Sequence, residues 1–215
     1  GIFGWYIVLP AYIIWLWWRF GRDPKPPMGA TSVWFSPPKG KEKHDLTPGE
    51  TGTLIDETVS MREISATIVD LARRGYMRIE ERKKKDFFLV RTDKPLEHDL
   101  KRHERTLLEG IFDGNRTELR IKTANLVSTI NAVKKHLYEQ VVSEGFFAKN
   151  PETQRKKYYA LGLLGMMTLN FFLGIAAFLF GRAMPRKTLL GAQEAAIATS
   201  LKHFLVSQER QLKFQ

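Results

Sequence analysis

The chain has 215 residues and a formal net charge of +11, with 43% hydrophobic and 27% charged residues. This is the balance of a folded protein, and it excludes an intrinsically disordered or collagen-like chain. Cysteine is absent, which excludes a disulfide framework, a thiolate zinc site, an iron–sulfur cluster and a thiol nucleophile.

The chain opens with an uncharged apolar block, Ile2 to Trp18, followed at once by Arg19 and Arg22. A helix that crosses the hydrocarbon core of a bilayer needs about 20 apolar residues, so this block is slightly short. Tryptophans beside the first arginine are typical of the aromatic belt at a membrane interface. We interpret residues 1–20 as a truncated transmembrane helix, with a buried core helix as the alternative.

Residues 21–46 are rich in Pro, Gly and Lys, which predicts an extended, solvated linker. Val33, Trp34 and Phe35 are the exception within it. They are expected either to form a short strand or to dock the linker on the folded domain.

A first folded domain is predicted over residues 47–95. Thr47 and Glu50 have the spacing of a capping box, so a short helix is expected to begin here and to end near Glu57. A second helix is expected from about Arg62 to Arg74, because apolar residues recur there at helical spacing.

A hairpin is expected after Gly75, with the strand YMRIE, a charged tip and the return strand FFLVRT. Two helices followed by a basic hairpin are typical of a winged-helix-like domain. Its cations are candidates for contact with an anionic lipid surface or a nucleic acid, and the favoured alternative is a solvated or protein-contact surface. These residues are Arg73, Arg74, Arg82, Lys83, Lys84 and Lys85.

The same pattern is expected to recur in degraded form over residues 96–157. A helix is predicted at about Leu100 to Phe112, a short strand at TELRI, and a longer helix at about Thr123 to Glu144. We interpret this region as a second, degenerate winged-helix-like region. Its helical face is expected to share one core with the first domain.

The second uncharged block, Tyr158 to Phe180, has 23 residues and is long enough for one helix to span a bilayer. Gly162, Gly165 and Gly174 would let a partner helix approach closely. Two spans of about ten residues are each too short to cross as helices. The block is therefore interpreted as a single transmembrane helix over residues 158–180.

The tail comprises residues 181–215, and its pattern predicts an amphipathic helix from 188 to 213. This helix is expected to lie on the membrane surface or to pack on the soluble domain. Residues 21–157 hold 27 of the 34 Lys and Arg residues, so the positive-inside rule places this segment in the cytoplasm of a multi-pass cell-membrane protein. The tail is also basic, with six Lys and Arg against two Asp and Glu. Either the second block is re-entrant, or the tail is translocated despite its charge.

Five runs of sequence occur in a specific order: LTPGETGTLIDETVSMREISATIVDLARRGYMRIEE, HERTLLEGIF, LYEQVVSEGFFAKNPETQRKKY, MPRKTLLGAQEA and KHFLVSQER. Together they resemble the bacterial predicted membrane proteins of domain of unknown function family 2207, over most of residues 21–210. The resemblance implies an N-terminal extracytoplasmic β-rich domain that this fragment lacks, then a membrane span, a cytoplasmic winged-helix-like region and a further membrane region. Family members have a longer apolar region before the MPR motif, often enough for two spans. The resemblance implies no activity and no functional residues.

Sequence motifs for catalysis are absent: there is no GxSxG elbow, no phosphate loop, no GxGxxG and no HExxH. The densest cluster of metal-ligand residue types is formed by Glu97, His98, Asp99 and His103. The two histidines are five residues apart and point in different directions on a helix. We therefore predict no metal site, no cofactor and no enzymatic activity.

The favoured hypothesis is an α+β protein held in the bilayer by flanking transmembrane helices. Its cytoplasmic winged-helix-like domain is expected to act as a protein-interaction or membrane-surface module, with a protein or a second copy of the chain as partner. The alternative is a membrane-tethered DNA-binding regulator, with the helix before the hairpin in the major groove. Glu63 and Asp70 on that helix, and a net charge of only +6 over residues 21–157, argue against nucleic acid.

A transport or channel component is a third hypothesis. Transport pathways usually place polar residues within the membrane-spanning segments. Only Thr168 and Asn170 qualify in the second block, so this hypothesis is the least favoured.

Overall fold

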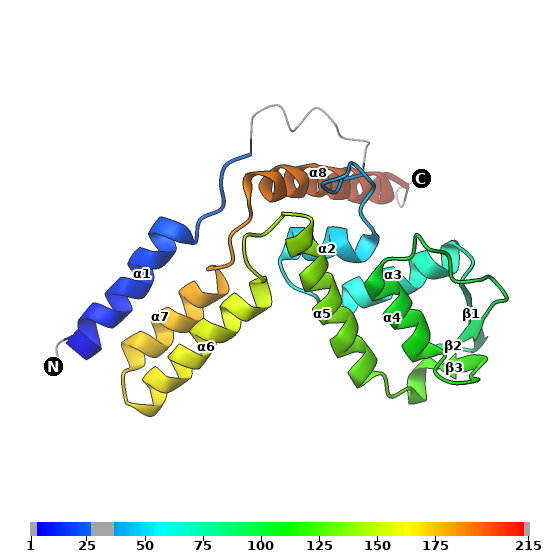
Figure 1. Ribbon diagram of the computed structural model, residues 1–215, viewed down its shortest axis with the longest axis horizontal. Helices are drawn as coiled ribbons and strands as arrows, with labels where there is room; N and C mark the ends of the chain where they lie inside the picture. Colours follow the sequence, from blue (N-terminus) through cyan, green and yellow to red (C-terminus); the bar gives the residue numbers. More distant parts are fainter. Residues whose placement is uncertain (1–3, 27–36, 213–215) are drawn as a thin grey trace. The chain divides into compact units, whose positions relative to one another are not determined.

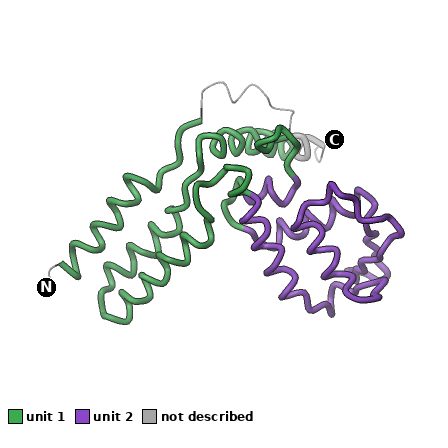
Figure 2. Tube along the Cα trace, in the orientation of Figure 1, with its two compact units in different colours: residues 1–46, 54–58, 141–215 green, residues 47–53, 59–140 purple. Residues whose placement is uncertain are grey.

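The computed structural model describes residues 4–26 and 37–212 (Figure 1). The chain divides into two compact units (Figure 2). Unit 1 comprises residues 1–46, 54–58 and 141–215, and unit 2 comprises residues 47–53 and 59–140. The α+β class is confirmed, because helices dominate the described residues and one small antiparallel sheet accompanies them.

Unit 2 contains a three-stranded sheet with the strand order β1-β2-β3. The third strand coincides with the predicted strand TELRI and pairs with the return strand of the hairpin. The elements in chain order are α2 (Pro48–Asp56, ending in unit 1), α3 (Met61–Arg73), β1 (Met77–Lys83), β2 (Asp86–Arg91), α4 (Arg102–Ile111), β3 (Glu118–Arg120) and α5 (Val127–Ser143, ending in unit 1). The predicted order of two helices and a hairpin is therefore present.

One hydrophobic core serves the whole of unit 2. Its fully buried members include Leu71 of α3, Leu107 and Ile111 of α4, and Leu137 of α5. The core thus draws on both predicted regions, as the sequence pattern indicated. The boundary expected at residue 95 lies inside this unit, and the last part of the second predicted region belongs to unit 1.

Helix ends in unit 2 follow local chemistry. The predicted capping box is confirmed: the Thr47 amide donates to Glu50 Oε2 at 2.8 Å, and the Glu50 amide donates to Thr47 Oγ1 at 3.3 Å. A second box, which the sequence analysis missed, starts α3, where Ser60 and Glu63 cap each other. Gly75 ends α3 with a φ of +86°, which a side chain would strain.

The helical elements of unit 1 are a π-helical turn (Gly4–Val8), α1 (Leu9–Phe20), α6 (Pro151–Met167), α7 (Phe171–Arg182) and α8 (Leu189–Leu212). The α8 helix agrees with the predicted tail helix, and Thr188 caps it by accepting from the Gly191 amide at 3.0 Å. A small core of unit 1 contains Leu46, Leu54 and Phe146. The expected short strand at Val33, Trp34 and Phe35 lies outside the described residues.

The second apolar block is not one helix, so the prediction of a single transmembrane helix over residues 158–180 is wrong. It folds as an antiparallel hairpin of α6 and α7, joined by a turn at residues 168–170. Leu169 adopts a φ of +60°, and the Asn170 side chain caps α7 by accepting from the Leu173 amide at 3.0 Å. The polar residues that interrupt the block therefore form the turn between α6 and α7 and the cap of α7.

Within the described residues, none of the helices combines the length and the apolar character that a bilayer crossing requires. The first block likewise forms a π-helical turn followed by the twelve-residue α1.

Candidate interaction surfaces

The hairpin of β1 and β2 carries four of the six candidate cations. Arg82 is not free to neutralise an external anion, because its guanidinium pairs with Glu118 at 2.6 Å and Glu80 at 3.2 Å. It also lies 4.3 Å over the ring of Phe88. The hairpin surface is therefore a mixture of both charge signs.

Three lysines form the turn and its approach. Lys83, Lys84 and Lys85 are exposed, and Lys85 adopts a left-handed conformation with φ of +62°. The Lys85 amide donates to Glu81 Oε1 at 2.6 Å, which orders the turn through an acidic side chain. The predicted basic tip thus exists.

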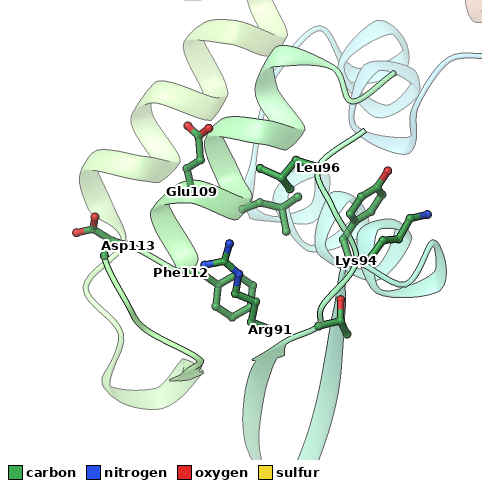
Figure 3. A pocket seen from close by; sticks show the side chains of 10 residues that line it. Arg91, Lys94, Leu96, Glu109, Phe112 and Asp113 are labelled. Atoms are coloured by element: carbon green, nitrogen blue, oxygen red, sulfur yellow. The ribbon is translucent and has the colours of Figure 1, made fainter. Parts of the chain in front are cut away.

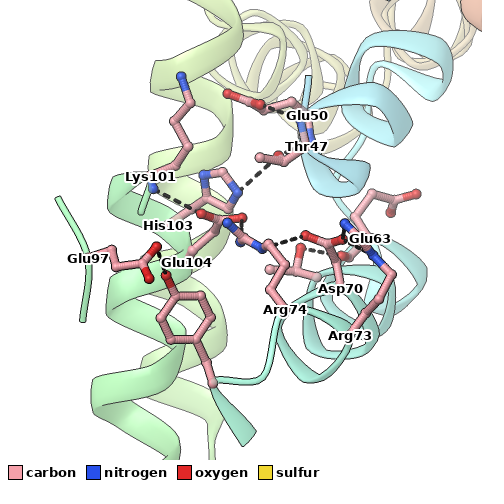
Figure 4. Close-up of polar contacts among 12 residues, drawn as sticks. Thr47, Glu50, Glu63, Asp70, Arg73, Arg74, Glu97, Lys101, His103 and Glu104 are labelled. Atoms are coloured by element: carbon pink, nitrogen blue, oxygen red, sulfur yellow. Dashed lines mark hydrogen bonds and ion pairs between the residues drawn. The ribbon is translucent and has the colours of Figure 1, made fainter. Parts of the chain in front are cut away.

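The other two candidate cations, Arg73 and Arg74, lie at the end of α3 and share Asp70 as a partner (Figure 4). Arg73 is exposed and pairs with Asp70 at 2.9 Å. Arg74 is mostly covered and bridges Asp70 at 3.0 Å and the buried carboxylate of Glu104. The structure therefore brings Arg74 into the fold and leaves Arg73 at the surface.

A buried polar cluster lies around the start of α4 (Figure 4). His103 is 1% exposed and its Nε2 lies 3.3 Å from Thr47 Oγ1. Burial, with a smaller contribution from Lys101 and Arg74, lowers the pKa of His103 to about 3, so its imidazole is neutral. Burial raises the pKa of Glu104 above its ordinary value, against the opposing effect of the Lys101 amide that donates to it.

This cluster does not have the composition of a metal site. The described residues contain no group of three or more His, Cys, Asp or Glu with the geometry of a metal site. Of the ligand types that the sequence analysis singled out, Glu97 pairs with Lys94 and accepts from the Tyr76 hydroxyl, whereas His103 is buried beside Thr47. The structure does not bring them together, and the cluster links α2, α3 and α4.

The exposed face of α3 differs from the prediction, which placed Glu63 and Asp70 there. Glu63 is 2% exposed because it caps the helix, and Asp70 turns toward the two arginines at the helix end. Burial alone raises the pKa of Glu63, but hydrogen bonds from Ser60 outweigh it and hold that pKa below its ordinary value. The exposed side chains of α3 are Met61, Arg62, Ser65, Val69 and Arg73.

A cavity of about 330 Å³ opens in unit 2 between the end of β2 and α4 (Figure 3). Arg91 and Lys94 contribute cations to its lining, and Glu109 and Asp113 contribute anions. Leu96 and Phe112 are among its apolar residues. A lining with both charge signs suits a mixed-charge peptide better than a polyanion.

Unit 1 places three apolar helical segments side by side. Ile13 of α1 packs with Leu173 and Ala177 of α7, and all three are nearly or fully buried. The glycines of α6 let α7 approach closely, as expected of small residues: a Cβ at Gly165 would lie 3.1 Å from the Gly174 amide nitrogen. The sequence analysis expected a partner helix here, and the partner is the second half of the same block.

The outward faces of these helices are apolar and uncovered. Their large exposed side chains are Tyr6, Ile7, Val8, Tyr12, Ile14, Trp15, Trp18 and Phe20 from the first block, and Leu163, Leu164, Met166, Met167, Leu169, Phe171, Phe172, Ile175, Phe178 and Leu179 from the hairpin. Water-soluble proteins rarely expose apolar side chains contiguously on this scale, and such patches mark contact with a membrane or another protein.

One of the comparisons with known proteins gives a match. The family described as predicted membrane protein (DUF2207) C-terminal domain matches residues 43–178. The chain belongs to this family. No curated protein and no solved structure matches the chain. The DUF2207 match runs from the segment before α2 into α7, so it includes all of unit 2 and most of the apolar hairpin.

Proposed function

We propose that this DUF2207 chain is a membrane-anchored interaction module without catalytic activity. Unit 1 holds the protein in the bilayer through α1, α6 and α7. Unit 2 is a winged-helix-like module that lies in the cytoplasm and docks a protein partner. The observation that carries the proposal is the uncovered apolar surface of unit 1.

The extent of this exposure supports lipid as the surrounding medium. Met167, Leu169 and Phe172 are 76%, 67% and 72% exposed. Moving apolar surface out of water is worth roughly 25 cal/mol per Å², so full burial of one such side chain contributes about 1.5–3 kcal/mol. In a bilayer, lipid covers the outward faces of α1, α6 and α7 together, so every exposed apolar side chain on them gains this free energy.

Charge on unit 2 favours a protein partner over a polyanion. Arg82 and Arg74 are neutralised by acidic neighbours within the fold. The exposed face of α3 combines the apolar Met61 and Val69 with two arginines, and the nearby cavity has both charge signs. Surfaces with apolar centres and mixed charges are typical of protein–protein recognition.

A flotation experiment tests the anchoring role. The full chain is reconstituted by detergent removal into vesicles of phosphatidylcholine and phosphatidylglycerol, which are floated on a density gradient. The chain is expected to float even at about 1 M salt, where the Debye length is only about 3 Å, because apolar burial holds it. A chain that stays at the bottom of the gradient, folded and free of lipid, contradicts the proposal.

Matched variants locate the anchor. Phe172→Asp together with Leu179→Asp is expected to reduce flotation, since an acid within the hydrocarbon costs about 2.5–3.5 kcal/mol. The control is Met61→Asp together with Val69→Asp, which places the same two charges at exposed apolar residues of unit 2. Flotation that is equally reduced by the control contradicts the assignment of the anchor to unit 1.

Photo-crosslinking in membranes tests the docking role. A photoreactive residue at position 69, on the exposed face of α3, is expected to give a discrete protein adduct. The control position is Lys122, which is exposed on the 3-10 turn after β3. Equal yields at both positions, or none at either, contradict docking through α3.

The DNA-binding alternative keeps one supporting observation. The exposed side chains of α3 include the cations Arg62 and Arg73, which suit a polyanion. Arg62 pairs with Glu63 at 3.3 Å and Arg73 pairs with Asp70 at 2.9 Å, so a polyanion has to compete with these acids. Duplex DNA is therefore titrated with the full chain in detergent micelles over a range of salt concentrations. Binding that weakens steeply with salt and is lost in Lys83→Ala/Lys84→Ala favours this alternative, and no binding at low salt removes it.

A further inference from the structure

We infer that the hairpin of α6 and α7 enters only one leaflet of the bilayer and returns to the side from which it came. The inference rests on the proposed anchoring role and adds the topology. It makes the segment before α6 and the segment after α7 face the same headgroup layer.

The length of the hairpin matches one leaflet. Its uncharged arms run from Tyr158 to Met167 and from Phe171 to Phe180, which is ten residues each. At 1.5 Å per residue each arm is about 15 Å long. The hydrocarbon core of a bilayer is about 30 Å thick, so each arm reaches its midplane and no further.

The tip of the hairpin is built for a medium without water. Polar groups of the turn pair internally: the Thr168 hydroxyl donates to the Leu164 carbonyl at 2.9 Å, and the Asn170 backbone amide donates to the Gly165 carbonyl at 2.8 Å. Asn170 is fully buried, and its side-chain amide donates to the Trp5 carbonyl. Hydrocarbon demands such internal pairing, because it offers no hydrogen bonds.

The residue in the left-handed turn position also points to lipid. Leu169 has φ of +60°, a conformation that glycine adopts without strain and that a branched side chain does not favour. Its side chain is nevertheless apolar and 67% exposed. A water-facing turn would gain from Gly or Asn here, whereas a turn at the bilayer midplane gains from the apolar side chain.

The opposite end of the hairpin is basic on both arms. Arg155 near the start of α6 donates from its Nε to the carbonyl of Arg182, the last residue of α7, at 3.4 Å. This bond places the two ends of the hairpin at one level. Exposed cations at these ends, which suit anionic headgroups, are Lys149, Lys157, Arg182 and Arg186. Lys156 is also exposed there and pairs with Glu152 at 2.8 Å.

A cavity at the basic end of the hairpin also has a lining that suits the headgroup layer. Its volume is about 360 Å³, and its lining combines Lys149 and Arg186 with apolar residues of α1, Leu16 and Phe20. Cations beside apolar walls suit the boundary between headgroups and acyl chains.

One-leaflet insertion also removes the charge conflict of the sequence. A single crossing would place the basic tail, from residue 181 onward, on the opposite side from the basic segment 21–157. The hairpin returns the chain, so both segments lie on the positive side of the membrane.

Single-cysteine variants test the topology cleanly, because the natural chain has no cysteine. The variants are Thr153→Cys before the apolar arm, Met167→Cys at the tip and Ser207→Cys on α8, all at exposed positions. Each full chain is placed in sealed membrane vesicles of one orientation and treated with a membrane-impermeant maleimide. Reaction after solubilisation in SDS serves as the control for each variant.

The inference predicts that Thr153→Cys and Ser207→Cys react from the same side and that Met167→Cys reacts from neither. A nitroxide on Met167→Cys is further expected to collide often with oxygen and rarely with a water-soluble nickel chelate. Reaction of Thr153→Cys and Ser207→Cys from opposite sides, or of Met167→Cys from either side, overturns the inference. The anchoring proposal fails separately, through a chain that does not float with vesicles at all.

Discussion

The two units use similar apolar side chains in opposite ways. Leu107 and Ile111 of unit 2 are fully buried in a shared core, whereas Leu179 and Phe172 of unit 1 are 65% and 72% exposed. The inner faces of α1 and α7 in unit 1 still pack tightly, around Leu173. The comparison teaches that unit 2 buries its large apolar side chains in its own core, while unit 1 leaves many of them exposed on its outward faces, which is the surface that the proposed lipid contact would cover.

The largest effect is expected from opening the core of unit 2. Leu107→Ala should lower the free energy of unfolding of unit 2 by about 2–5 kcal/mol, because a cavity replaces a fully buried side chain. The matched variant is Leu179→Ala on α7, which should leave that free energy within about 0.5 kcal/mol. Denaturant unfolding in detergent measures both, and equal losses in the two variants would break the comparison.

A smaller loss is expected from crowding the inner face of the hairpin. Gly165→Val adds a branched side chain where a Cβ already lies 3.1 Å from the backbone of α7, so it should destabilise the α6–α7 pairing by about 1–3 kcal/mol. Leu163→Val, at a 58% exposed position of the same helix, is the control. Thermal aggregation followed by size exclusion in detergent should separate them, and indistinguishable profiles would count against close packing of the hairpin.

The buried imidazole of unit 2 predicts a pH dependence with a definite sign. The pKa of His103 is lowered to about 3, below its ordinary value of 6.5, so between these values the unfolded chain binds the extra proton. Stability should therefore fall as pH falls below 6.5, by as much as about 1.4 kcal/mol per pH unit from this group. The raised pKa of Glu104 acts in the opposite direction, since the folded state then holds its proton to higher pH.

Denaturant unfolding of the full chain between pH 6.5 and 4.5 measures this slope, with His103→Gln as the variant that reduces it. Burial also lowers the pKa of His136, so part of the slope remains in that variant. Glu63, whose pKa is lowered, adds to the loss only as pH falls below its ordinary value of 4.5. An unchanged slope in His103→Gln would show that the imidazole is not buried and neutral.

The smallest effect is expected at the surface hairpin of unit 2. Arg82→Ala removes ion pairs with Glu80 and Glu118 that are all well exposed to water. Such pairs are screened by solvent and salt, so the melting temperature should hardly change. A large drop on Arg82→Ala would mean that this surface is part of the closed core, contrary to the comparison.

Local signals in the sequence predict several helix ends and the hairpin of unit 2. Capping at Thr47, the stop at Gly75 and the alternation of the hairpin all act within a few residues, and the structure confirms each of them. Partners far apart in the chain are beyond such reasoning, as where Arg74 meets Glu104 across 30 positions. The inward turn of Glu63 is a local capping box with Ser60, three residues away, which the sequence analysis missed. Those contacts changed which cations and acids face outward.

Unit 1 was harder to predict for a physical reason. In a block that is apolar all round, hydrophobic periodicity carries no information on where a helix ends. The local signals in the second block are the glycines and the short polar stretch at Thr168 and Asn170, and such a stretch also fits an interruption within one helix. The cap formed by Asn170, together with the left-handed Leu169, shows that this stretch is the hairpin turn.

The most direct measurement of the central claim uses the tryptophans of the first block. Trp15 and Trp18 are 49% and 59% exposed on α1, the face assigned to lipid. The full chain is reconstituted into vesicles that contain lipids brominated along the acyl chains, and tryptophan emission is recorded. Strong quenching relative to unbrominated vesicles is the predicted result; emission that bromine leaves unchanged would contradict lipid as the medium around unit 1.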